Sequence, residues 1–222
     1  MTYKDISDAL SPHGLICRGA TALPLDDPIK PGGFLVMVGN AGPQMWRAFA
    51  ASSDLSQQNP MDAWTRQVVD PIASEFKAQA LYPFDGPPYH PFQQWAQRAE
   101  PVFPSPIGPL VHPVYGLWHA YRAALVFDQV IGVPEFEGVS SPCESCADKP
   151  CLKTCPVGAF GLDHYNVPVC VDHLDASPPT KCGLRGCMAR HACPVGQDFT
   201  YEPEQAQFHM EKFVSSQRNP RF

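Results

Sequence analysis

The sequence has no run of basic residues and no long apolar segment. Its 16 Lys and Arg are scattered among 22 Asp and Glu, which gives a net charge of -6 and a pI near 5.7. Nucleic-acid surfaces need clustered positive charge, and a transmembrane helix needs roughly 18 or more consecutive apolar residues. Residues 1–7 also contain no apolar core of a secretion signal. We therefore expect a soluble cytoplasmic protein that binds neither nucleic acid nor membranes.

Cysteine is concentrated in one segment of the chain. Eight of the nine cysteines fall between residues 143 and 193. The first four have the spacing CxxCxxxxCxxxCP and are Cys143, Cys146, Cys151 and Cys155. The last four, again with a proline after the final one, are Cys170, Cys182, Cys187 and Cys193. This pattern is typical of a two-cluster ferredoxin, in which the cysteine before the proline ligates the other cluster.

The spacing predicts two [4Fe-4S] clusters with crossed ligation. A cluster needs four thiolates from different directions, and a CxxC turn supplies two of them from one loop, so the fourth comes from a distant segment. The first cluster is expected to be held by Cys143, Cys146, Cys151 and Cys193. The second is expected to be held by Cys155, Cys170, Cys182 and Cys187. The ninth cysteine, Cys17, is not needed as a ligand and is expected to be a small buried apolar residue.

Three other interpretations of the cysteines stay open. Disulfides are typical of short secreted chains with an export signal, and thiolate clusters need a reducing compartment. Two Cys₄ zinc sites are the stronger alternative, because CxxC is also a common zinc knuckle. The clusters could also be structural staples, since spacing indicates ligation and not electron flow.

The pattern outside the cysteine segment indicates a mixed fold. With 222 residues, 44% of them hydrophobic, the chain can bury one substantial core beside a small metal-stapled module. Its 26 prolines are spread along the chain and favour short elements with stiff loops. We predict a strand buried on both faces at residues 33–39, a long amphipathic helix after an Asn59 N-cap, a short helix at 92–99 and a core strand from His119 to Phe127.

Three stretches of the N-terminal part carry a family resemblance. They are Lys30-Pro-Gly-Gly-Phe-Leu-Val-Met-Val, Asn59-Pro-Met-Asp and Val111-His-Pro-Val-Tyr-Gly-Leu-Trp-His-Ala-Tyr-Arg-Ala-Ala-Leu-Val-Phe. They resemble the cobalamin-processing protein of the CblC type. That family has an α+β fold of the flavin-reductase or nitroreductase-like kind, binds cobalamin, and removes its upper axial ligand reductively or by transfer to glutathione. The resemblance implies that residues 1–135 form a cobalamin-binding-like α+β domain.

The same resemblance supplies candidates for cofactor binding. Arg98 and Arg122 match arginines that the family uses around its thiol cosubstrate, and His112 matches the histidine of the His-Pro motif. Tyr121 is a further pocket candidate. A planar guanidinium suits anionic groups, so the two arginines are expected to hold an anionic cosubstrate or a corrin side chain.

The order of the parts resembles epoxyqueuosine reductase and the reductive dehalogenases. In those enzymes a two-cluster ferredoxin module directly follows a cobalamin-binding domain and passes electrons to the cobalt. Here a short linker through Pro134 and Glu135 leads to the first cysteine motif. The resemblance implies that residues 136–222 are a ferredoxin-type 2x[4Fe-4S] module, and apolar spacing predicts that it ends in a C-terminal helix over 202–216.

Together these patterns predict an iron-sulfur oxidoreductase that passes electrons from two [4Fe-4S] clusters to a bound cobalamin and removes its upper axial ligand. Its expected partners are a soluble electron donor and a corrinoid or another small-molecule ligand. Three alternatives stay open: a ferredoxin-like electron carrier, a cobalamin chaperone without substrate chemistry, and a flavin-dependent reductase built on the same fold.

Overall fold

The computed structural model describes residues 2–133, 136, 138–161 and 164–219. The chain forms two compact units. The first comprises residues 1–102 and 119–139, and the second comprises residues 103–118 and 140–222. The second unit therefore includes a segment that precedes the predicted domain boundary, and the boundary itself, at residue 135, lies outside the described residues. Among the described residues, no helix has the length and apolar character needed to cross a bilayer.

The first unit is built on a four-stranded sheet with the strand order β1-β2-β6-β3. Its strands are β1 (Ile16–Ala22), β2 (Phe34–Ala41), β3 (Gln79–Leu81) and β6 (His119–Phe127), and all three pairings are antiparallel. Every β2 residue from Phe34 to Asn40 is buried, which confirms the prediction of a strand covered on both faces. The predicted core strand from His119 is confirmed as β6.

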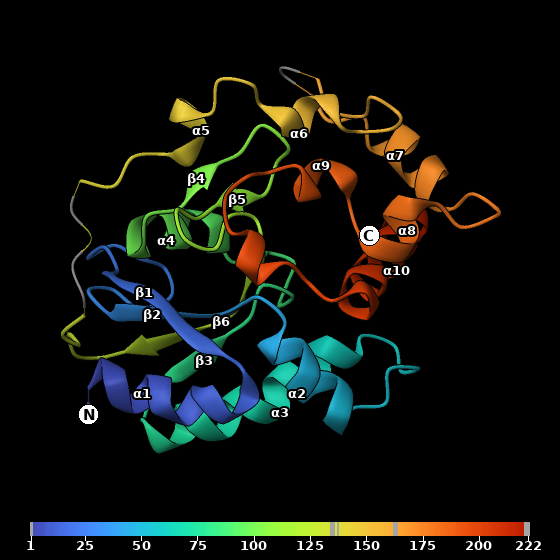
Figure 1. Cartoon of the computed structure of the whole chain (residues 1–222). Helices are drawn as coiled ribbons and strands as arrows, with labels where there is room; N and C mark the ends of the chain where they lie inside the picture. The colour runs from blue at the N-terminus through green and yellow to red at the C-terminus, as the bar shows by residue number, and fades with distance from the viewer. Residues whose placement is uncertain (1, 134–135, 137, 162–163, 220–222) are drawn as a thin grey trace. The chain divides into compact units, whose positions relative to one another are not determined.

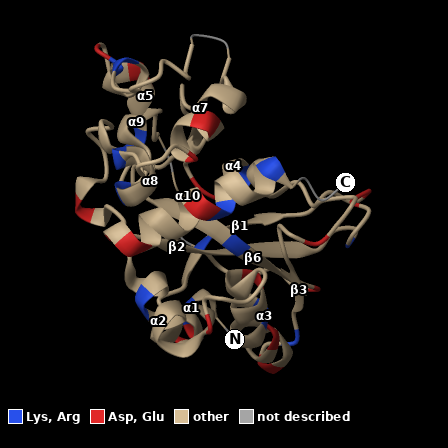
Figure 2. Ribbon diagram, turned by 90° about the vertical axis from the view of Figure 1, so that its right-hand side faces the viewer, with Lys and Arg blue, Asp and Glu red and all other residues tan. Residues whose placement is uncertain are grey.

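Helices cover both faces of this sheet (Figures 1 and 2). Helix α4 (Phe92–Ala99) packs on β1 and β2 from one side. The other side is covered by α1 (Tyr3–Leu10), α2 (Gln44–Ser52) and α3 (Pro60–Glu75). The predicted helices at 92–99 and after Asn59 are confirmed, and the unit has a mixed α+β fold. Asn59 is the N-cap residue of α3, as predicted, in a left-handed conformation and without a side-chain capping hydrogen bond.

A buried ion pair ties α4 to the sheet. Arg18 of β1 is 1% exposed, and its Nη2 lies 2.6 Å from Oε1 of Glu100, the residue that ends α4. The same guanidinium donates to the Asn40 carbonyl at 3.1 Å and lies 3.2 Å from Nδ1 of His119. The Tyr121 hydroxyl donates to Glu100 at 2.5 Å. Charges this deeply buried are tolerated because each is paired and hydrogen-bonded.

The second unit consists of short elements and one long helix, α10. It contains β4 (Phe103–Pro104), β5 (Leu110–Val111), α5 (Pro142–Ser145), α6 (Pro150–Lys153), α7 (Val167–Leu174), α8 (Lys181–Arg185), α9 (Met188–His191), the 3₁₀ helix η2 (Gln197–Phe199) and α10 (Pro203–Arg218). Helices α5, α6, α7 and α10 each have proline in the first turn, where its fixed φ suits a helix start. The predicted C-terminal helix is confirmed as α10, which packs on α8 and α7.

Candidate metal centres

Four cysteines surround a first cavity in the second unit. They are Cys143, Cys146, Cys151 and Cys193. Cys143 lies in α5, Cys146 ends that helix, and Cys151 follows Pro150 in α6. Cys193 comes from the distant segment after α9. The remaining wall is mostly apolar and is made by Pro106, Val111, Pro142, Lys149, Pro150, Pro194 and Val195.

The other four cysteines surround a second cavity in the same unit. They are Cys155, Cys170, Cys182 and Cys187. Cys170 lies in α7, Cys182 lies in α8, and Cys187 is the N-cap of α9. The Cys155 sulfur accepts a hydrogen bond of 3.3 Å from the backbone N–H of Ala159. The structure thus brings the cysteines together in the two crossed sets that their spacing predicts.

Local capping bonds fix the helices that carry these cysteines. The Ser141 hydroxyl accepts from the N–H of Cys143 at the start of α5. The Asn166 side chain accepts from the N–H of Val169 at the start of α7, and the Thr180 hydroxyl caps α8 in the same way. Each cap satisfies a backbone donor that the first turn of a helix leaves unpaired. Cys143, Cys170 and Cys182 are therefore presented from short helices whose first turns are capped by a side chain.

Burial raises the pKa of three thiols in each group: Cys143, Cys151 and Cys193 in the first, and Cys170, Cys182 and Cys187 in the second. For Cys143 burial is the main cause, and the neighbouring Cys193 and Cys151 raise the pKa further. Burial raises the pKa of Cys187 to about 11. Such thiols hold their protons in the metal-free protein, so metal binding must release them.

The donor set of each cavity fits an iron-sulfur cluster. Each set provides four thiol groups arranged around a space, and four thiolates are the ligands of a [4Fe-4S] cube. Around a single tetrahedral zinc the sulfur atoms meet at one point, at about 2.3 Å from the ion. Within the described part of the chain, no group of three or more His, Cys, Asp or Glu is arranged to hold a single metal ion.

The segment 103–118 forms part of the wall of the first cavity, which we call the first centre. Its residues Ile107, Val111 and Leu117 pack with Cys151 and Ala189 in one buried cluster. The backbone of Tyr115 and Gly116 lies directly against that of Val195 and Gly196, which follow Cys193. The two glycines have φ values of +57° and +74°, and a Cβ on Gly116 would overlap the Val195 carbonyl oxygen. Glycine is therefore required for this close approach.

We expect Gly116→Ala to loosen the loop that carries Cys193. The substitution adds steric overlap and an unfavourable positive φ, so the first centre should bind metal less tightly. The measurement is the rate of iron loss to a chelator under anaerobic conditions, with Gly108→Ala as a control, because a Cβ there meets nothing within 4 Å although its φ is also positive, at +101°. Equal rates of iron loss in the two variants would contradict the expectation.

His112 lies in the second unit and not in the first. Its Nδ1 accepts the backbone N–H groups of Val114 and Tyr115 at 3.0 and 3.2 Å, so this nitrogen carries no proton. The ring stacks on Tyr115 with 4.3 Å between centroids, and the side chain is 7% exposed. In this structure the histidine of the His-Pro motif holds the turn that ends at Gly116. Its role in cofactor binding stays a prediction.

The other three predicted cofactor-binding residues lie in the first unit. Arg98 is exposed on α4, whereas Arg122 and Tyr121 are half-buried neighbours on β6. Arg122 is the extra residue of a β-bulge, because Val38 and Gly39 of β2 pair with Ala123 and Tyr121. A bulge re-aims the side chain at its position, which is frequent beside functional sites.

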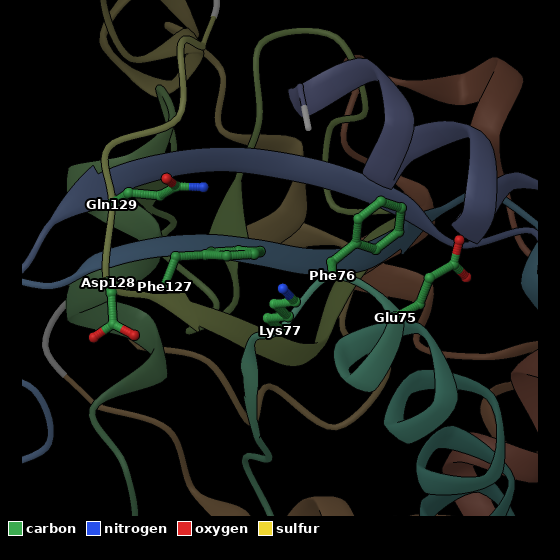
Figure 3. Close-up of a pocket in the computed structure, with 6 residues that line it drawn as sticks. All are labelled: Glu75, Phe76, Lys77, Phe127, Asp128 and Gln129. Atoms are coloured by element: carbon green, nitrogen blue, oxygen red, sulfur yellow. The ribbon is translucent and has the colours of Figure 1, made fainter.

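A pocket of the first unit lies where α3 and β6 end (Figure 3). It is lined by Glu75, Phe76, Lys77, Phe127, Asp128 and Gln129. Its volume is about 480 Å³. Asp128 also forms an ion pair of 2.5 Å with Lys30. None of Arg98, Tyr121 and Arg122 lines this pocket, so it is separate from the predicted cofactor-binding residues.

Solved structures of two proteins are similar to this chain. A B12-trafficking protein CblC from C. elegans, a human MMACHC homologue, aligns with a TM-score of 0.56 at 14% identity, over 99% of this chain and 97% of that chain. The chain shares the fold of CblC. Epoxyqueuosine reductase from Streptococcus thermophilus aligns with a TM-score of 0.52 at 13% identity, over 91% of this chain and 69% of that chain. Neither protein-family models nor curated protein sequences match the chain.

The similarity confirms the two resemblances read from the sequence. CblC matches the chain over nearly its whole length, and the reductase matches most of it. At these identities the likeness establishes a mixed α+β fold and no particular chemistry.

Two polar side chains beside the second cysteine cavity, Tyr165 and His173, were not predicted. The sequence feature that could have identified His173 is its position three residues after Cys170, because residues three apart lie on the same side of a helix.

Proposed function

We propose that this chain is an iron-sulfur protein that delivers electrons from two [4Fe-4S] clusters to a bound corrinoid and thereby removes its upper axial ligand. The observation that supports this most is the presence of two four-cysteine cavities in a chain that has the fold of a B12-trafficking protein. Epoxyqueuosine reductase, a second structural relative, is named as a reductase.

The chain's own residues would hold, shield and orient the bound groups. When bound, the clusters would carry single electrons and the corrinoid cobalt would carry out the reduction. The eight cysteines would supply the thiolates, and the apolar residues Pro106, Val111 and Val195 would shield the first cluster from water. We propose Arg98 and Arg122 as anion-binding residues for a corrin side chain or an anionic cosubstrate, because a guanidinium fork suits carboxylate and phosphate groups.

The test is anaerobic purification of the full chain, followed by iron and sulfide analysis and a visible spectrum before and after adding cyanocobalamin and dithionite. We expect an iron-sulfur spectrum, a change in the corrinoid bands that reports displacement of the lower base, and release of cyanide faster than with dithionite alone. An Arg122→Met variant should bind cobalamin more weakly and keep its iron.

Each other result assigns a different function. Clusters without any corrinoid spectral change would contradict the proposal and indicate an electron carrier. Corrinoid binding without cyanide release would indicate a chaperone. A flavin spectrum would indicate a flavin-dependent reductase, and a colourless zinc-loaded protein would exclude redox function of the cysteine module.

A further inference from the structure

The two cysteine cavities differ in the polar groups beside them. Among the described residues that line the first cavity, Lys149 alone is charged, and the other non-cysteine residues are prolines and valines. The second cavity has a histidine in its wall, His173, and the tyrosine Tyr165 beside one of its cysteines, Cys170. Polar groups next to a cluster change its electronic properties, because reduction adds negative charge there.

His173 lies in α7, one helical turn after Cys170, and lines the second cavity. Its Nε2 is buried and has no hydrogen-bond partner among the described residues. A buried polar atom without a partner is costly, and such atoms in native proteins usually mark a missing ligand or water. The sulfur atoms of a cluster are hydrogen-bond acceptors. A protonated Nε2 of His173 could therefore donate a hydrogen bond to a sulfur of the second cluster, and both atoms would then have a partner.

Tyr165 contributes a second donor to the same centre. Its side chain lies beside the Cys170 thiol, because each of the two groups shifts the pKa of the other. Burial raises the pKa of the Cys170 thiol, and the neighbouring Tyr165 hydroxyl lowers it. The pKa of Tyr165 is itself raised by burial first, then by the neighbouring Cys170 thiol, and by the nearby Cys187 and Cys155.

The position of Tyr165 is fixed on both sides. Its ring stacks on Phe160, which lines the second cavity, with 4.7 Å between centroids and 21° between planes, and the two residues form a backbone bridge. The next residue, Asn166, donates its N–H to the Ala159 carbonyl at 2.8 Å and caps α7. The hydroxyl is therefore held at Cys170 by an ordered ring and an ordered helix start.

We infer that Tyr165 and His173 are positioning residues that donate hydrogen bonds to the second cluster and raise its reduction potential. This inference rests on the proposed iron-sulfur content of the module. The physical reason is that a donor to a ligand or cluster sulfur stabilises the more negative, reduced state. The step is the addition of one electron from a chemical reductant to the cluster, without bond cleavage.

The experiment is a dithionite titration of the full chain, followed by electron paramagnetic resonance, in Tyr165→Phe and His173→Leu. Each substitution removes one donor and should shift the reduction equilibrium of the second cluster about tenfold toward the oxidised form, which for one electron is about 59 mV. The first cluster should keep its potential in both variants. Its signals are identified by comparison with Cys193→Ala, which is expected to retain the second cluster alone.

A donor-retaining variant separates hydrogen bonding from packing. His173→Gln keeps an N–H of similar reach and should shift the potential less than His173→Leu. Unchanged potentials in Tyr165→Phe and His173→Leu, with both clusters present, would overturn the inference. Loss of the second cluster from both variants would also overturn it, because the two side chains would then be needed for assembly.

This test is independent of the corrinoid. Wild-type protein without iron would refute the proposed function before any variant is measured. Wild-type protein with two clusters but no cobalamin binding would refute the proposed delivery of electrons to a corrinoid. The reduction potentials of the variants would still test the roles of Tyr165 and His173.

Discussion

Replacing Cys193 with alanine is expected to remove the first iron-sulfur cluster and leave the second one in place. Cys193 lies 38 residues after Cys155 in the chain, yet it lines the cavity of Cys143, Cys146 and Cys151. Iron content should fall from about eight to about four atoms per chain, because each cube carries four irons. Iron and sulfide analysis, together with the visible absorbance of the clusters, measures this loss.

The reciprocal variant makes the crossed arrangement testable. Cys155→Ala should remove the second cluster and retain the first, although Cys155 follows the first three cysteines in sequence. Cys17→Ala is the matched control and should keep all the iron, because Cys17 lies in β1 of the other unit. If Cys155→Ala and Cys193→Ala lost the same cluster, crossed ligation would be wrong.

Replacing Arg18 with methionine is expected to lower the free energy of unfolding by about 3–5 kcal/mol, because it leaves a buried carboxylate without its cation. Glu100 is 7% exposed and loses both guanidinium contacts, at 2.6 and 3.2 Å. The Asn40 carbonyl also loses its donor. Urea unfolding followed by tryptophan fluorescence under anaerobic conditions measures the change.

Two further variants identify the cause of that loss. Arg18→Met combined with Glu100→Leu removes both charges and should recover part of the stability. Lys4→Met breaks the exposed pair with Asp8, whose side chains are 78% and 62% exposed, and should have little effect. A loss in Arg18→Met no greater than that in Lys4→Met would contradict a stabilising role for the buried pair.

The regular elements of the first unit were predictable because each has a strong local pattern. The run Phe34–Asn40 is apolar or small at nearly every position, which suits only a strand covered on both faces. Helix α3 keeps apolar residues three or four positions apart and begins at a proline. The burial of Arg18 was not predictable, because its carboxylate partner is 82 residues away and no local pattern links them.

The sequence by itself predicted which four cysteines line each cavity, because in the two-cluster ferredoxin pattern the cysteine before the proline ligates the other cluster. It also predicted the strands and helices in which apolar residues recur at a regular spacing. The tertiary structure alone decided that residues 103–118 wall the first centre, that His112 holds a turn, and that Tyr165 and His173 flank the second centre. Such contacts join distant or differently oriented segments, and they are fixed by packing and hydrogen bonding rather than by neighbouring residues.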